Sequence, residues 1–497
     1  MRRIQTFILA AATLLGGCQT LPADPPKPVS LAIENVTVID PETKRVLPGR
    51  SVYVEGSRIL AVAAAQGRVR YAPRTRVDGT GKFLIPGLMD MHVHLFLPEP
   101  SMPTLNLLLA NGVTGIREMA SDCWAPAGRK VGCVEEYRAL QAAVRPGDTP
   151  GPELLSLTSA MIMGPTRLQV PKELDPTIVP TTAEEARRVV RYLKARGLDR
   201  IKTHDSIPTE AFVALMAEAR AVGIEVSGHV PFRPGSLGVA RQGYGSIEHA
   251  RDLLYDCSRY GAEFRQASAD FSDRKAGAVR PGNLDRLVRT VAEYDPKLCA
   301  AFLAQLAGTG VYYAPTHVTR EMEARAREAA YRNDERRKYV LHPRNKNWEA
   351  DLDETAALPP EEAEALRRFF EHGLLVTGMA YRAGIPIMAG TDASDTMIVP
   401  GFSLHNELLL LAKAGLPPME VLRSATAVPA AYLRKSDRFG GVSAGKEADL
   451  VLLRANPLSD IRNTASIEAV IANGRLYDRA ALDALLAEAE RAASASK

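Results

Sequence analysis

The sequence predicts an α/β protein: a distorted (β/α)₈ barrel (TIM barrel) with a small β-sandwich domain built from both ends of the chain. Between residues 85 and 429, short apolar strands alternate with helical segments. Residues 31–84 and 430–480 contain short alternating strands instead. Strands separated by helices favour a parallel sheet, and eight such units suit a closed barrel. The two outer β segments most simply pair into one domain beside it.

The composition is that of an ordinary globular protein. The 497 residues are 46% hydrophobic and 24% charged, with a net charge of +4, and basic and acidic residues are interspersed. This length allows a core of ample size. Nothing in the charge pattern favours a nucleic-acid partner. A homo-oligomer is compatible with the sequence, which does not specify one.

Residues 1–17 resemble a bacterial lipoprotein signal peptide. A positive start precedes an apolar run, Phe7–Leu15, that is too short to span a bilayer. Small residues then lead to Cys18, where we expect cleavage and lipidation. Residues 18–30 are Pro-rich and polar, as a tether is. We therefore predict an exported protein held by its lipid anchor alone at the periplasmic face of the outer membrane; a cytosolic protein is the alternative.

Export permits disulfide bonds. Besides Cys18 the chain has four cysteines, which allow three pairings. We expect Cys123–Cys133 and Cys257–Cys299, because each pair brackets one connecting segment. Free buried cysteines are the alternative.

The strands of the outer β segments alternate polar and apolar residues and are bounded by turn residues. They are expected at 30–40, 50–56, 58–62, 448–453, 467–472 and 475–477, with a turn at Asn473-Gly474. The Ala-rich residues 481–497 are expected to form a C-terminal helix.

The barrel strands are short apolar runs separated by helical segments. They are expected at 88–92, 113–117, 153–158, 200–203, 224–227, 246–248, 311–314 and 385–389. The barrel region is longer than a typical (β/α)₈ barrel, and the additional residues lie mainly after the sixth strand (252–298) and after the seventh (321–371). The second excess is densely charged and helical, so we expect a cap or outer layer.

The first barrel strand runs into His92 and His94. Side chains two apart leave a strand on the same side, so these imidazoles would lie side by side, as two ligands of one metal ion do. Ligand-type residues also stand at the ends of the fourth, fifth, sixth and eighth strands: Lys202, His204, His229, His249 and Asp392. Singly, each is explained by a polar cap or a turn. Together they predict a metal site, because the carboxyl ends of barrel strands form one mouth.

Four further residues are weaker candidates for substrate binding. Arg117 ends the second strand and could bind a substrate carboxylate; a salt bridge with Glu118 is the alternative. His204 and His317 would face the mouth if their strands continue. The alternative for each is a structural hydrogen bond within the protein. His405 begins a helix beyond the eighth strand and could orient the aspartate there or line the pocket.

Several stretches together carry a family pattern. They are Pro86-Gly-Leu-Met-Asp-Met-His-Val-His94, Ile201-Lys202, Gly228-His-Val-Pro231, Ser246-Ile-Glu-His249, Gly390-Thr-Asp392, Ser424-Ala-Thr426 with Pro429-Ala430, Gly445-Lys-Glu-Ala-Asp-Leu-Val-Leu452 and Asn473-Gly474. With them the chain resembles the amidohydrolase superfamily, in its imidazolonepropionase- and prolidase-like branch. The resemblance covers nearly all of the chain after the tether.

The resemblance implies a binuclear metal centre, usually zinc. His92, His94 and Asp392 would hold the more buried ion, and His229 and His249 the more exposed one.

Lys202, carboxylated by CO₂, would bridge the two ions together with a hydroxide. A carbamate supplies two anionic oxygens on a long side chain, enough to span ions about 3.5–4 Å apart. The alternative is a lysine in a buried salt bridge and a site for a single ion.

The resemblance also implies hydrolysis of an amide-type C–N bond by the metal-bridging hydroxide. Asp392 would accept the hydroxide proton and pass it to the leaving amine. We expect first a dipeptidase or prolidase-like enzyme acting on small peptides, and next a cyclic amide or lactone hydrolase. Alternatives of another class are a non-catalytic surface binding lipoprotein and a cell-surface scaffold.

Overall fold

A computed structural model describes residues 26–65, 71–95, 101–121, 133–164, 179–393 and 395–496. The signal peptide, the lipidation site Cys18, residues 19–25 of the predicted tether, and Cys123 lie outside these ranges and stay predictions. Residues 27–30, predicted as the end of the tether, instead form the start of strand β1 (Lys27–Asp40). Among the described residues, no helix is long and apolar enough to cross a membrane.

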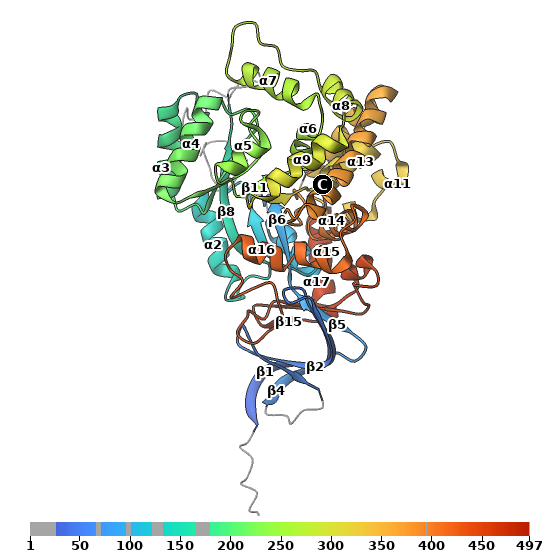
Figure 1. Ribbon diagram of the computed structural model, residues 1–497. Coiled ribbons are helices and arrows are strands. Elements are labelled where there is room, and N and C mark those ends of the chain that lie inside the picture. The colour runs from blue at the N-terminus through green and yellow to red at the C-terminus, as the bar shows by residue number, and fades with distance from the viewer. Residues whose placement is uncertain are drawn as a thin grey trace, which may run out of the picture.

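A seven-stranded parallel sheet forms the barrel, with its strands in chain order (Figure 1). They are β6 (Leu88–Val93), β7 (Val113–Glu118), β8 (Glu153–Ile162), β9 (Arg200–Thr203), β10 (Glu225–Gly228), β11 (Ser246–Glu248) and β12 (Tyr312–Ala314). This confirms the predicted fold class.

The predicted eighth strand, 385–389, is not a regular strand. It makes one bridge to β12 and, a few residues on, one to β6. The Met388 amide donates to the Tyr313 carbonyl at 2.8 Å, so the segment still closes the barrel between the last and first strands. Pro386 has no N–H to donate to a ladder, which explains part of the irregularity.

Helices surround the barrel and fill the two long connections that the sequence indicated. They are α1 (Ser101–Ala110), α2 (Val134–Val144), α3 (Ala183–Ala195), α4 (Thr209–Val222), α5 (Gly235–Arg241), α6 (Asp252–Asp256), α7 (Gly261–Ser272), α8 (Asn283–Ala292), α9 (Pro296–Ala307), α10 (His317–Arg325), α11 (Ala329–Arg332), η1 (Glu335–Tyr339), α12 (His342–Ala356), α13 (Pro360–Arg382), α14 (Phe402–Lys413), α15 (Pro418–Ser424), α16 (Ala427–Tyr432), η2 (Ile461–Ala465) and α17 (Arg479–Ala495). In α3, the Thr182 side chain accepts from the Glu185 amide, a capping box, and the apolar residues at helical spacing are buried.

The disulfide Cys257–Cys299 joins the end of α6 to α9, the pairing expected from the sequence, with an S–S distance of 2.09 Å. Cys133 is also disulfide-bonded. Its pairing with Cys123 stays a prediction, because Cys123 is not among the described residues.

Strands from both ends of the chain join in one eight-stranded sheet. Its order is β15-β14-β13-β5-β1-β2-β3, with β4 on β1. The strands are β1 (Lys27–Asp40), β2 (Arg45–Glu55), β3 (Arg58–Ala64), β4 (Tyr71–Asp78), β5 (Phe83–Pro86), β13 (Leu450–Leu453), β14 (Ile467–Ala472) and β15 (Arg475–Tyr477). Two of these strands were not predicted from the sequence: β4 is charged and largely exposed, and β5 is only four residues long. Asn473 and Gly474 have φ values of 50° and 74°, as a two-residue hairpin turn requires.

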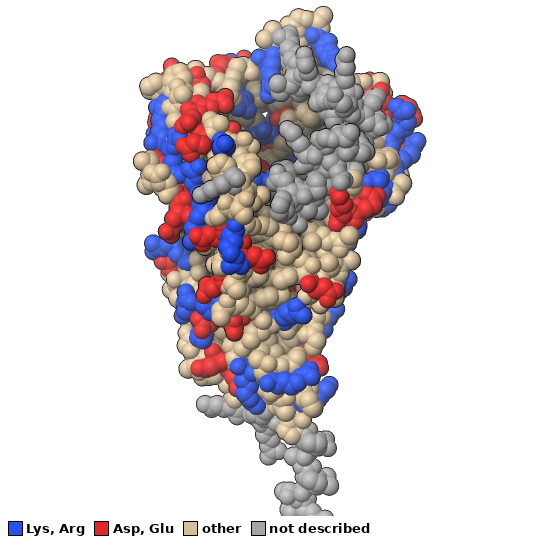
Figure 2. Space-filling model, turned by 180° about the vertical axis from the view of Figure 1, so that it is seen from behind, with Lys and Arg blue, Asp and Glu red and all other residues tan. Residues whose placement is uncertain are grey.

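The sheet lies against the amino ends of the barrel strands. β5 pairs with β13 and continues through Gly87 directly into β6, so the barrel strands run away from the sheet (Figure 1). Their carboxyl ends therefore lie at the far end of the molecule. One face is hollowed near that end, and acidic and basic side chains are interspersed over it (Figure 2).

Tyr432, at the end of α16, points into the barrel, where its hydroxyl contacts polar side chains of the strands. Its hydroxyl lies 2.9 Å from Arg117 Nη1, 3.1 Å from Arg200 Nε, 2.8 Å from Ser227 Oγ and 3.2 Å from Ser246 Oγ. Four barrel strands thus meet on one phenol that belongs to the chain beyond the barrel.

We expect Tyr432→Phe to destabilise the protein by about 2 kcal/mol, because it leaves the buried Arg200 Nε without a partner and removes one of the two bonds of Arg117 Nη1. A lower midpoint of urea unfolding measures this loss. The matched control is Tyr312→Phe: the Tyr312 ring packs on the Tyr432 ring, but its hydroxyl has no hydrogen bond within the described residues. Equal midpoints for both variants would contradict the role of the Tyr432 hydroxyl.

Candidate metal centre

Three predicted ligands meet at the carboxyl ends of β6 and of the irregular eighth segment. Nε2 of His92 lies 3.4 Å, and Nε2 of His94 3.2 Å, from Oδ1 of Asp392. One ligand atom from each residue lies within 4.8 Å of the others. Zinc binds nitrogen and oxygen at about 2.0–2.2 Å in a tetrahedron, which sets ligands roughly 3.3 Å apart. The two imidazole–carboxylate distances match that spacing.

Lys202, from β9, points into the same cluster. Its Nζ lies 3.1 Å from Nε2 of His92 and 3.3 Å from Nε2 of His94, and the residue is 2% exposed. Burial lowers the pKa of Lys202. A lowered pKa increases the fraction of neutral amine, the form that reacts with CO₂.

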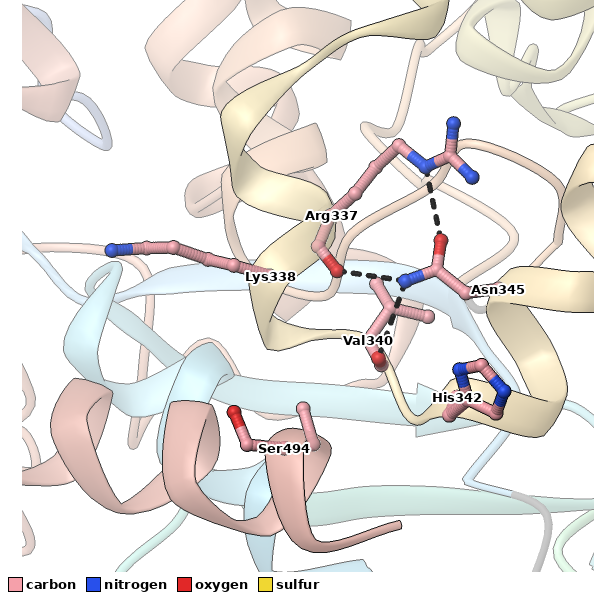
Figure 3. Close-up of a pocket in the computed structure, with 7 residues that line it drawn as sticks. Arg337, Lys338, Val340, His342, Asn345 and Ser494 are labelled. Carbon is pink, nitrogen blue, oxygen red and sulfur yellow. Dashed lines mark hydrogen bonds between the residues drawn. The ribbon is translucent and has the colours of Figure 1, made fainter. Parts of the chain in front are cut away.

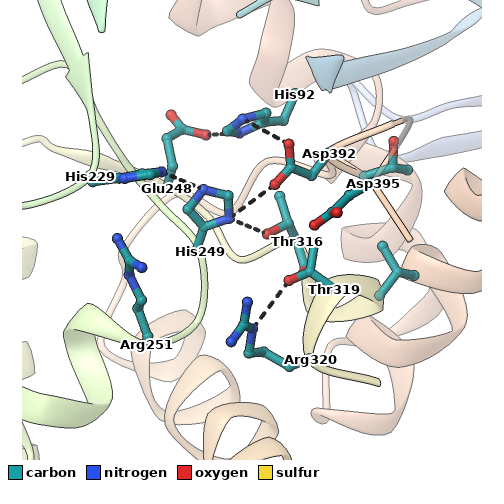
Figure 4. A network of polar contacts seen from close by, with 12 residues as sticks. His92, His229, Glu248, His249, Arg251, Thr316, Thr319, Arg320, Asp392 and Asp395 are labelled. Carbon is teal, nitrogen blue, oxygen red and sulfur yellow. Dashed lines mark hydrogen bonds and ion pairs between the residues drawn. The ribbon is translucent and has the colours of Figure 1, made fainter. Parts of the chain in front are cut away.

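His229 and His249 face one another beside these residues. Their Nε2 atoms lie 2.9 Å apart, and Nδ1 of His249 lies 2.7 Å from the Thr316 hydroxyl (Figure 4). Nδ1 of His249 also lies 3.7 Å from Oδ2 of Asp392, so the carboxylate touches both groups of histidines. Within the described part of the chain, the buried Nδ1 of His229 has no hydrogen-bond partner.

The electrostatics keep the imidazoles neutral and the carboxylate charged. Burial, reinforced by Lys202, lowers the pKa of His94 to about 4. Burial and the charge of Arg251 hold the pKa of His229 well below its usual value. Burial alone would raise the pKa of Asp392, but the surrounding imidazoles hold it well below the usual range. Neutral imidazoles and an anionic carboxylate are the forms that bind a metal, so the donor set fits divalent ions such as zinc.

Two residues that the sequence analysis did not assign a role, Glu248 and Thr316, orient the histidines. Glu248 Oε2 lies 3.0 Å from Nδ1 of His92, and both residues are fully buried. Because the carboxylate accepts there, Nδ1 carries the hydrogen and Nε2 presents its lone pair to the cluster. The Ser246-Ile-Glu-His249 stretch contained Glu248, but nothing local indicated that its side chain would reach β6.

Arg117 is not a substrate-binding residue. The residue is 0% exposed, and its Nη2 donates to both oxygens of Glu248 at 2.7 and 2.8 Å. Its Nε donates to the Met91 carbonyl at 2.6 Å. The alternative of a salt bridge was correct in kind, but the partner is Glu248 rather than Glu118.

His204 lies at the mouth, with its ring 4.8 Å from that of His229. Its Nδ1 lies 3.0 Å from the Ser206 hydroxyl and 2.8 Å from Oδ1 of Asp205. Substrate contact by His204 stays a prediction.

His317 and His405 do not line the mouth. His317 is wholly buried, with Nε2 2.9 Å from the Thr377 hydroxyl of α13, because α10 begins at His317 and packs against α13. His405 bonds the Thr464 hydroxyl and the Asn111 carbonyl at 3.0 and 3.1 Å. Asn111 lies just before β7, at the end of the barrel opposite the ligands, so His405 cannot orient the aspartate.

A separate pocket of about 370 Å³ lies between the η1–α12 segment and α17 (Figure 3). It shares no residue with the ligand cluster. Its basic side chains already have acidic partners: Arg337 lies 2.8 Å from Glu349, and Lys338 3.0 Å from Glu490. The first pair joins η1 to α12 and the second joins η1 to α17, and the residues that line this pocket offer no comparable set of ligands.

Comparisons with known proteins agree with the motifs. The profile of the Amidohydrolase family matches residues 179–477. An adenine deaminase of Chelativorans sp. (strain BNC1) is 38% identical over 90 residues, which are 17% of this chain and only 14% of that protein.

Solved structures share the fold over most of the chain. A bottromycin amidohydrolase has a TM-score of 0.70 and 24% identity, covering 93% of this chain and 90% of that one. A Xaa-Pro dipeptidase with methionine bound in its active site has a TM-score of 0.62 and 20% identity, covering 90% and 99%. At these identities the likeness establishes the fold.

We expect Thr316→Val to weaken zinc binding by about 10–100-fold, because it removes the hydroxyl that orients His249. Competition with a chelating dye measures the affinity. Thr316→Ser keeps the hydroxyl and should bind as the unchanged protein does. Unchanged affinity in a folded Thr316→Val variant would show that the hydroxyl has no such role.

Proposed function

The chain belongs to the amidohydrolase family, and from that premise we propose that it is a metal-dependent hydrolase of amide-type C–N bonds in small peptides. The observation that carries the proposal is the convergence of residues from separate strand ends on one cluster. They are His92, His94, Lys202, His229, His249 and Asp392.

Small peptides are the first substrate candidate because two proteins with this fold over nine-tenths of the chain are named for peptide hydrolysis. One is the Xaa-Pro dipeptidase and the other a putative prolidase from Bifidobacterium longum. The partial likeness to adenine deaminase supports a second candidate, the hydrolysis of a C–N bond at a heterocyclic ring.

Divalent ions held by this donor set would supply an activated water and polarise the scissile carbonyl. Asp392 would act first as the general base and then as the general acid. It stays ionised among three imidazoles, so it can accept a proton from the attacking water. It would then give that proton to the leaving nitrogen as the C–N bond breaks, and the products are a carboxylate and an amine. The left-handed backbone of Asp392, with φ of 65°, places its side chain at the cluster.

The activity test is hydrolysis by zinc-loaded protein across a dipeptide library, with lactams, lactones and adenine as further arms. We expect turnover of one or more dipeptides and a loss of at least about 10³-fold in kcat for Asp392→Asn. Turnover of a lactam, a lactone or adenine, and of no dipeptide, would replace the first candidate. If none of these compounds is hydrolysed, the result would favour a binding protein.

We further propose that the Lys202 amine bonds to CO₂ with loss of a proton, forming a carbamate whose two oxygens would be available as ligands for divalent ions held by the histidines and Asp392. The position of Nζ between two imidazoles and its lowered pKa support this.

We expect Lys202→Met to reduce bound zinc from about two ions per chain to about one, because only the bridging group is lost. Elemental analysis of purified protein measures the ratio. Met keeps the length and apolar stem of the side chain, so overall packing should hold. Two ions per chain in the variant would exclude the carbamate bridge.

A further inference from the structure

One apolar side chain lies at the mouth of the barrel among polar groups. Met161 stands near the carboxyl end of β8, and its register partner on β9 is Lys202. Residues that pair on neighbouring strands point to the same face of the sheet. Lys202 points into the barrel, where it contacts His92 and His94. The Met161 side chain therefore also points into the mouth, beside the ligand cluster.

The neighbouring residues of β8 agree with this orientation. Thr158 pairs with Arg200, whose side chain reaches the Tyr432 hydroxyl inside the barrel. Ile162, the residue after Met161, is fully buried in a core that includes apolar residues of α3 and α4. Since side chains alternate along a strand, Ile162 faces the helices and Met161 faces the inside.

Met161 is left open to solvent at this place. It is 38% exposed, whereas Lys202, its partner, is 2% exposed. The other exposed large apolar side chains of the described chain lie on surrounding helices, on a connection or in the outer sheet, where single exposed residues are ordinary. Among the described barrel strands, only Met161 exposes a large apolar side chain. Binding sites are lined largely by apolar groups with a few polar groups that orient the ligand, and Met161 supplies apolar lining beside the metal-type residues.

We propose that Met161 forms an apolar subsite that receives an aliphatic or aromatic side chain of the substrate. This inference rests on the proposed function and narrows it: among small peptides, the enzyme prefers those with an apolar side chain next to the scissile bond. A thioether side chain is flexible and adapts to the shape of its partner. The subsite therefore distinguishes apolar from polar side chains, but discriminates little among leucine, methionine and phenylalanine.

The test compares dipeptides that contain leucine with dipeptides that contain asparagine, whose side chain has nearly the same shape but is polar. Each of the two residues is placed in turn on either side of the scissile bond. With zinc-loaded protein, we expect kcat/KM for the leucine substrate to exceed that for the asparagine substrate by about 10–100-fold at one position or both, because only the apolar side chain gains by leaving water.

Variants of Met161 assign the preference to this side chain. Met161→Gln should reduce the ratio to about 3-fold or less, whereas Met161→Leu should keep it. The matched control is Leu409→Gln, because Leu409 is exposed to a similar extent, 42%, but lies on helix α14. A ratio near one in the unchanged protein, or a ratio that Met161→Gln leaves unaltered, would overturn the subsite and leave peptide hydrolysis intact.

Binding provides a readout that does not need turnover. Hydroxamates bind zinc, so L-leucine hydroxamate and L-asparagine hydroxamate present the two side chains at the loaded site. The leucine compound should raise the melting temperature more than the asparagine compound does, and Met161→Gln should remove the difference while its zinc content stays unchanged. If no peptide is hydrolysed but this difference is present, the proposed reaction fails and the apolar subsite stands. Equal shifts from both compounds would refute the subsite.

Discussion

A buried ion pair between Arg117 and Glu248 connects the interior of the barrel with its ligands. Desolvating two charges costs several kcal/mol per ion, so such a pair is tolerated only when nearly every donor and acceptor is used. Here Arg117 bonds Glu248, the Met91 carbonyl and the Tyr432 hydroxyl. Burial alone would raise the pKa of Glu248, but Arg117 and His92 hold it below its usual range. The same carboxylate that neutralises the arginine therefore fixes the orientation of a metal-type histidine.

The second constraint is local strain at the mouth. His249, Thr316 and Asp392 have φ values of 71°, 44° and 65°, in a region that costs non-glycine residues of order 1–3 kcal/mol each. Backbone hydrogen bonds between neighbouring strand ends hold two of them: the His249 amide donates to Ala314 at 2.8 Å, and the Asp392 amide to His92 at 2.8 Å. Closure of the barrel thus holds the backbone in left-handed conformations at the strand ends where the side chains converge. At an isolated strand end, without these hydrogen bonds, the backbone would return to a more favourable conformation.

The sequence predicted the barrel and the ligand cluster well because both follow from short-range rules. Strand alternation placed His92 and His94 side by side, and the common mouth of a parallel barrel brought Lys202 to them. The predictions that were wrong concern residues whose partners lie far away in the sequence. Nothing near Arg117 in the chain reveals that Glu248, 131 residues later, completes its pairing. Tyr432 lies beyond the last barrel segment, and its place inside the barrel is set by tertiary packing alone. The predictions for His317 and His405 were wrong because helix packing decides where their side chains point. The periodicity of a single sequence does not specify that packing.

Arg117 and Arg251 show how far sequence position falls short of function. Both stand at or just beyond the carboxyl end of a barrel strand, and both are flanked by acidic residues in the chain. The difference lies in their donors. A guanidinium buried inside the strands must have its bonds made by the protein itself, since an unpaired buried charge would destabilise the fold. One on the connection after a strand stays partly exposed: the Arg251 side chain is 18% exposed and is anchored by the carboxylates of Asp205 and Asp252. The same residue type therefore joins strands inside the barrel in one case and anchors a loop at the mouth in the other, and partners from other parts of the chain decide which.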